Sequence, residues 1–210
     1  MISSLTTPAA ALALDWANEV KGHLRLDVDT EKTRVESLLI PAAADWCEAV
    51  TGRQLINATW TFWWPSFDAA CQPGCGLGFP SDAIVLPRPP LGGVTHVKYY
   101  DTANAIQTWS ASNYAVVAPA GPKASPGWLR PVAPATYPST YERPDAVEIR
   151  LVAGYGASYA SVPGGLKQAM LILLAELFER REEAVTGTII QQVPVGALSL
   201  ALGYLAPGAP

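Results

Sequence analysis

Charged residues are scarce in this chain of 210 residues. Only 15% are Asp, Glu, Lys or Arg, and the formal net charge is −4 at pH 7. A protein that reads nucleic-acid sequence normally presents a basic face, which this balance disfavours. It does not exclude DNA passing nearby, because a mildly acidic wall repels phosphates. Half of the residues are hydrophobic, which indicates surface buried against other subunits.

Long hydrophobic runs are missing as well. No uninterrupted apolar run reaches the ~18–20 residues needed to cross a bilayer. The nearest, residues 170–174, runs into Glu176, Glu179 and Arg180. The start of the chain has no basic segment, and its Ala/Leu run at 9–14 is short. We therefore expect neither a signal peptide nor a membrane span.

Residues with reactive or metal-binding side chains are few, with three cysteines and two histidines. Cys47 falls in a helical pattern and reads as a small core residue. Cys71 and Cys75 flank Gln-Pro-Gly in a loop, and a disulfide between them is left open. A zinc site needs about four ligands, which two cysteines and two distant histidines do not supply.

Neither catalytic nor phosphate-binding constellations stand out. His96 has Ser110 and Asp101 nearby in sequence, but nothing fixes them as a base, nucleophile and orienting acid. The Gly-rich stretch 74–78 lacks the Lys-Ser/Thr of a phosphate-binding loop, and no helix follows it. We expect no enzyme, no cofactor and no metal.

Helical periodicity marks both ends of the chain. Trp16, Val20 and Leu24 form one apolar stripe, and a second helical series covers residues 30–50, with a kink or break at Pro41. These predict an antiparallel helical pair over 15–52 that ends at Gly52. A long helix over 162–183 is apolar nearly all round and needs partners on several faces. Thr6-Thr7-Pro8 is a further possible helix start.

A period of two predicts an antiparallel sheet over the β part, residues 54–152. Strands are expected at 56–64, 84–86, 94–100, 106–109, 114–117 and 147–151, at the spacing of a meander. Trp63, on the face opposite Phe62, is an interface candidate. Seven prolines in 118–145 predict an extended arm without regular strand or helix.

The resulting fold class is α+β, with an N-terminal helical pair and a long C-terminal helix flanking a central antiparallel sheet. Residues 1–187 are expected to form one domain. Residues 188–210 form an apolar tail that we expect to dock on a neighbouring subunit or a partner. Its candidate contact residues are Ile189, Ile190, Val193, Val195, Leu198, Leu200, Leu202, Tyr204 and Leu205.

The order of several short segments resembles the head–tail connector (adaptor) family of tailed bacteriophages and gene transfer agents. The segments are Val20-Lys21-Gly22-His23-Leu24-Arg25-Leu26-Asp27, Thr51-Gly52-Arg53-Gln54-Leu55-Ile56, Leu86-Pro87-Arg88-Pro89-Pro90-Leu91, Val97-Lys98-Tyr99-Tyr100-Asp101, Ala153-Gly154-Tyr155-Gly156, Val162-Pro163, Leu166-Lys167-Gln168-Ala169 and Val193-Pro194-Val195-Gly196-Ala197-Leu198. The run Leu-Pro-Arg-Pro-Pro-Leu, read as a central hairpin, is the most specific of them. The loop 66–82 and the Pro-rich arm are longer than the family pattern.

The resemblance implies a structural protein of the virion neck, assembled in the host cytoplasm. It implies a ring, usually of twelve subunits, that sits beneath the portal protein, extends the DNA channel and receives a stopper or tail-completion protein. DNA would pass through without sequence-specific binding, and the tail would anchor on the portal. Arg25, Arg53 and Arg88 are candidates for inter-subunit or turn-locking hydrogen bonds. The alternative is a β-rich tail or receptor-binding module that grips a protein or glycan.

Overall fold

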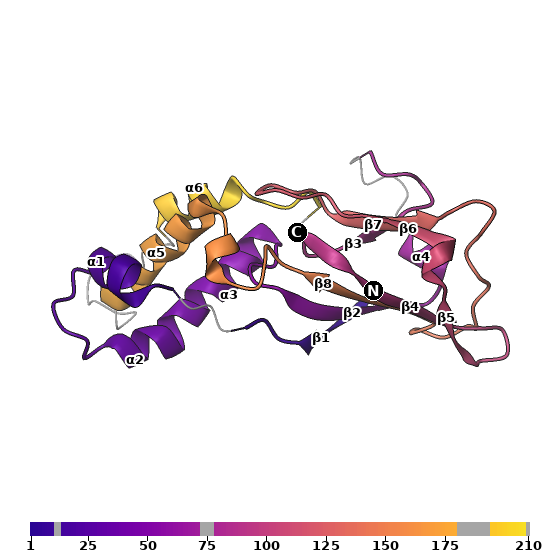
Figure 1. Ribbon diagram of the computed structural model, residues 1–210, viewed down its shortest axis with the longest axis horizontal. Coiled ribbons are helices and arrows are strands. Elements are labelled where there is room, and N and C mark those ends of the chain that lie inside the picture. The colour runs from indigo at the N-terminus through magenta and orange to yellow at the C-terminus, as the bar shows by residue number, and fades with distance from the viewer. Residues whose placement is uncertain (11–13, 72–77, 180–193, 209–210) are drawn as a thin grey trace, which may run out of the picture.

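Two layers of β-structure occupy one end of the molecule and a group of helices occupies the other (Figure 1). The computed structural model describes residues 1–10, 14–71, 78–179 and 194–208. The α+β fold class is confirmed, with helices beside antiparallel sheet. The expected single central sheet is in fact two sheets.

All strand pairs within the two sheets are antiparallel. The five-stranded sheet has the order β1 (Ile2–Thr7), β2 (Ala58–Trp64), β8 (Val147–Ala153), β4 (Leu91–Tyr100) and β5 (Ile106–Trp109). The three-stranded sheet has the order β3 (Ile84–Leu86), β7 (Gly127–Pro131) and β6 (Tyr114–Val117). The short helices α4 (Phe67–Ala70) and η3 (Ala111–Asn113) lie among the strands.

Alternation along the strands builds the core between the sheets. Phe62 and Trp64 of β2 and Ile149 and Leu151 of β8 are buried on one side, and they pack with Leu129 of β7. The intervening residues of β2 and β8 face the other side of the five-stranded sheet. The two-residue period therefore predicted both the strands and the face that they bury.

A second core joins the helices. The chain enters through η1 (Trp16–Val20) and α1 (Lys21–His23), returns through α2 (Lys32–Arg34), η2 (Val35–Leu39) and α3 (Ile40–Thr51), and later adds η4 (Tyr159–Ser161), α5 (Gly164–Glu179) and α6 (Val195–Leu202). Trp16, Val20, Val35 and Leu166 meet in this core.

The two points of the helical pair that carry Pro and Gly have definite roles. Pro41 lies in the first turn of α3, where a missing N–H is tolerated, and the widened π-helical turn η2 directly precedes it. Gly52 ends α3 with φ of 65°, a left-handed conformation that favours glycine. Cys47 is buried in α3, as expected, and burial raises the pKa of its thiol to about 12.

Three sequence-based expectations about the β part were wrong. Residues 2–7 form strand β1 rather than leading into a helix, and Pro8 follows the end of that strand. Residues 127–131 of the Pro-rich arm form β7, because between the flanking prolines Leu129 can face the core while its neighbours do not. The strands are also not a meander, since β8 inserts between β2 and β4.

The segment 86–91 is a corner between sheets rather than a hairpin. Strand β3, before the corner, pairs with β7, whereas β4, after it, pairs with β8 and β5. Arg88 at the corner has φ of 60°, and the Pro89–Pro90 peptide bond is cis. Main-chain groups hold the corner in place, because Pro89 O accepts from Gln54 N and Pro90 O accepts from Gly154 N.

The part of the apolar tail that the structure describes packs against its own chain. Helix α6 lies along α5 (Figure 1) and buries Ala197 and Ala201, and Ala206 beyond it is buried too. The tail residues Ile189, Ile190 and Val193, the last residues of the predicted helix 162–183, and Cys75 all lie outside the described residues. None of the helices that the structure describes is long and apolar enough to cross a membrane.

Candidate assembly interface

Arg53 ties the C-terminal segment to the middle of the molecule. Only 1% of its surface is exposed. The Nε of its guanidinium donates to the carbonyl oxygen of Tyr204. Its Nη1 donates to the carbonyl oxygen of Ala124 at 2.8 Å. Ala206 N donates to Thr51 O at 2.8 Å, directly beside Arg53. One buried side chain therefore joins the end of α3, the Pro-rich arm and the tail.

Tyr204 completes this junction with its ring. It lies so close to Gly165 that a Cβ there would stand 2.7 Å from the ring. The Lys123 ammonium lies 5.4 Å from the ring centre, a cation–π contact. Of the predicted contact residues, the structure brings together Arg53 and Tyr204, and both make internal contacts.

The outer side of the docked tail is apolar. Val195 is 76% exposed, and Leu202 and Leu205 are exposed too, whereas Leu198 and Leu200 are half-buried. Buried alanines let α6 lie close to α5, and Val195 and Leu202 stand exposed at the two ends of α6. This exposed row is the part of the predicted tail interface that stands open to another protein.

Arg88 is packed within the chain rather than spread in solvent. Its guanidinium lies 3.9 Å from the centre of the Trp60 ring, and burial lowers the pKa of Arg88. Nearby, Glu48 Oε1 accepts from Leu55 N and from the Gln54 side chain. Burial raises the pKa of Glu48, although the positive charge of Arg88 opposes this.

Arg25 and Trp63 lie apart from these clusters. Arg25 is exposed just after α1, with φ of 54°. Trp63 is half-buried on the outer face of the five-stranded sheet, where its indole N–H donates to Glu148 Oε2 at 3.2 Å. A subunit-interface role for Arg25, Arg53, Trp63 and Arg88 stays a prediction.

Glu148 is the centre of a polar group on that outer face. His96 Nε2 lies 2.8 Å from Glu148 Oε1, and Arg150 Nη2 lies 3.8 Å from the same oxygen. Burial alone would raise the pKa of Glu148, but the hydrogen bonds from His96 and Trp63 and the charge of Arg150 outweigh it and hold the pKa below its usual value.

The lowered pKa of Glu148 predicts an acid-sensitive contribution to stability. The unfolded state binds more protons than the folded state between the two pKa values, so this contribution is present above the unfolded value of about 4.3 and is lost as the pH falls through the folded value. We expect Glu148→Gln to unfold with a weaker dependence on acid than the wild type, as measured by urea denaturation from neutral to acid pH. Glu142→Gln, at an exposed position, is the control. Coinciding curves for wild type and Glu148→Gln would contradict the prediction.

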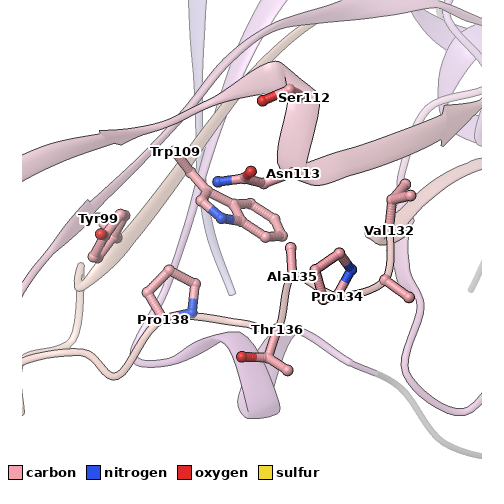
Figure 2. A pocket seen from close by; sticks show the side chains of 10 residues that line it. Tyr99, Trp109, Ser112, Asn113, Val132, Pro134, Ala135, Thr136 and Pro138 are labelled. Carbon is pink, nitrogen blue, oxygen red and sulfur yellow. The ribbon is translucent and has the colours of Figure 1, made fainter.

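A shallow cavity of about 480 Å³ lies beside β5 and η3, at the β-rich end of the molecule. Figure 2 shows Trp109 and Tyr99 from the sheet facing Pro134 and Pro138 of the Pro-rich arm, with Asn113 beside them. Trp109 is only 5% exposed, because it packs among other aromatic rings. The Trp109 ring therefore offers little surface on which a sugar ring could stack.

The described residues contain no cluster of three or more His, Cys, Asp or Glu side chains placed to hold a metal ion. Sequence reasoning missed the junction of Arg53, Ala124 and Tyr204. Ala124 lies 71 positions and Tyr204 151 positions after Arg53 in the sequence. Arg53 bonds to their carbonyl oxygens, which any residue supplies, so neither partner stands out in the sequence.

Comparison with solved structures shows the fold in particles of gene transfer agents (GTAs). A chain from the neck of an empty GTA particle, computed with C6 symmetry, has a TM-score of 0.73 and 23% identity. A chain from the virion of a native GTA particle has a TM-score of 0.73 and 22% identity. A chain from the neck of a native GTA particle, computed with C12 symmetry, has a TM-score of 0.65 and 20% identity.

Each of these matches covers 100% of this chain and 100% of the other. No protein-family model matches the sequence. No curated protein is similar to it at a significant level. The likeness to these neck chains agrees with the resemblance to head–tail connectors at the level of the fold.

Proposed function

We propose that this protein is a structural component of a virion neck that forms a ring beneath the portal, extends the DNA channel and joins the capsid to the tail. The observation that carries the proposal is the likeness to GTA neck chains over the full length of both partners, with a TM-score of 0.73. Its role is assembly rather than catalysis. The absence of a metal-ligand cluster from the described residues is compatible with that role.

A ring of identical subunits needs two different surfaces that fit one another. The related necks were computed with C6 and C12 symmetry, which supports a ring of twelve copies here. The net charge of −4 suits a channel wall that does not retain DNA. The remaining partners in this proposal are the portal on one side and a stopper or tail-completion protein on the other.

We propose that the tail contacts the portal. Because α6 of the tail also packs against α5 of its own chain, a test must change the exposed side of α6 without removing this packing. Deleting residues 188–210 would also remove Ala197 and Ala201 from the core. Substitutions on the exposed side of α6 leave this buried packing unchanged. We expect the double variant Val195→Asp/Leu202→Asp to bind portal at least about tenfold more weakly, because each charge would be buried in an apolar contact.

Binding of this variant to purified portal can be measured by analytical ultracentrifugation or surface plasmon resonance. Val132→Asp is the matched control, since Val132 is an exposed apolar residue near the other end of the molecule. Unaltered unfolding temperatures would show that both variants are folded. Equal portal binding by the double variant and the wild type would contradict anchoring through this side of α6.

The receptor-binding alternative makes a different prediction about mass. A neck protein should be monomeric alone or form rings, and should bind a portal, whereas a receptor binder more often forms trimers. The mass in solution, with and without portal, therefore separates the two functions.

A further inference from the structure

Neither edge strand of the five-stranded sheet carries a charged side chain or a proline. Natural edge strands are normally guarded by charged side chains, prolines or coverage by other elements. Here β1 has the sequence Ile-Ser-Ser-Leu-Thr-Thr and β5 has Ile-Gln-Thr-Trp, with no charge in either. The charged residues of this sheet lie instead on its inner strands, as Lys98 on β4 and Glu148 and Arg150 on β8.

Both edge strands are accessible. Every residue of β1 is exposed, and in β5 all but Trp109 are. In the described part of the chain, β1 pairs only with β2, and β5 pairs only with β4 (Figure 1). A bulge interrupts β1 between Leu5 and Thr7, which leaves residues 2–5 in regular register. Each strand therefore offers a row of main-chain N–H and C=O groups on its outer side.

The two edge strands, β1 and β5, also run in the same direction, which suits a contact that repeats from subunit to subunit around a ring. Four antiparallel steps separate β1 from β5, so the two strands run in the same direction. A head-to-tail contact joins two different surfaces of identical subunits, and it closes into a ring when the rotation between them fits. The three-stranded sheet offers fewer free groups for such a contact, because Cys71 already bridges to Ile84 on its β3 edge.

We propose that the β1 edge of one subunit pairs in parallel with the β5 edge of the next, so that the five-stranded sheets continue from subunit to subunit around the ring. This rests on the proposed neck function and specifies which surface of a second copy of this chain occupies each edge. Main-chain hydrogen bonds hold the contact, and the exposed apolar residues Ile2 and Ile106 add buried area.

Cysteine cross-linking tests the proposal, because Ser4 and Thr108 lie on the same face of the sheet. Ser4 is aligned with Thr61, Arg150 and His96, and Thr108 is aligned with Lys98 and Glu148 in the adjacent row of that face. Under mild oxidation, Ser4→Cys/Thr108→Cys is expected to give a ladder of disulfide-linked multimers. Each single variant should give no more cross-linked product than the wild type, which controls for the native cysteines.

Charge substitutions give a second, independent readout. Ser4→Lys and Thr108→Lys are each expected to weaken self-association about tenfold in sedimentation, since a solvated ammonium opposes pairing at the edge. Thr102→Lys adds the same charge at an exposed position in the β4–β5 turn and should have no effect.

The outcomes separate this proposal from the function on which it rests. Rings on the portal without a cross-linked ladder, or dimers from Ser4→Cys alone, would overturn the β1–β5 contact while leaving the neck function in place. A chain that stays monomeric at about 1 mM and forms no ring on the portal would overturn both.

Discussion

The Arg53→Ala variant is expected to lose about 3–4 kcal/mol of unfolding free energy. The change deletes a buried guanidinium and leaves the carbonyl oxygens of Tyr204 and Ala124 without their donor. Unpaired buried polar groups cost about 1–3 kcal/mol each, and the emptied volume adds to the loss. The end of the tail should also become more open to proteases, since Arg53 is one of its main attachments to the body.

Urea denaturation followed by tryptophan fluorescence measures this loss. Arg53→Lys should recover part of the stability, because an ammonium can still donate to one carbonyl oxygen but lacks the planar fork that reaches two. Arg130→Ala is the control, since Arg130 is exposed and its ion pair with Asp82 spans 3.6 Å at the surface. A loss below about 1 kcal/mol for Arg53→Ala would show that the junction does not hold the tail.

The Gly154→Ala variant is expected to lose about 3 kcal/mol of unfolding free energy. Gly154 has φ of 139°, and a Cβ there would lie 2.5 Å from Asn57 N and 2.6 Å from the Ile56 carbonyl carbon. Both are main-chain atoms, so no side chain can rotate away. Hydrogen bonds from Gly154 N to Pro90 O, and from Asn57 N to Gly156 O, oppose a shift of either segment. Backbone strain at the positive φ and the clash of the added Cβ with the main chain therefore both lower the stability of the variant.

Thermal unfolding compares this variant with Gly22→Ala. Gly22 lies in α1, and a Cβ added there would meet no atom within 4 Å. Alanine in a helix is favoured over glycine by about 0.5–1 kcal/mol, so the control should be neutral or slightly more stable. Equal unfolding temperatures for the two variants would contradict the close approach at Gly154.

Local patterns in the sequence predicted most elements of this fold. The alternation around Phe62 and Ile149 identified β2 and β8 and their buried faces, and Gly52 marked the end of α3. These features depend on residues close in the chain, whose spacing follows directly from strand and helix geometry. The order of the strands was not predictable in this way, because the pairing of β8 with β2 joins residues far apart in sequence.

The candidate interface was less predictable for a related reason. Strand β1 was missed because Pro8 also suits a helix start, and β7 was missed because proline density outweighed the four residues that separate Pro126 from Pro131. The tail was recognised as too apolar to float free, but sequence could not show that α6 folds back onto α5. That contact depends on the small residues Ala197 and Ala201, which carry little signal of their own.

Electron microscopy of the purified protein, alone and mixed with its portal, tests the central claim most directly. The account predicts rings seated coaxially on the portal. A protein that stays monomeric in both samples and leaves the portal bare would contradict it.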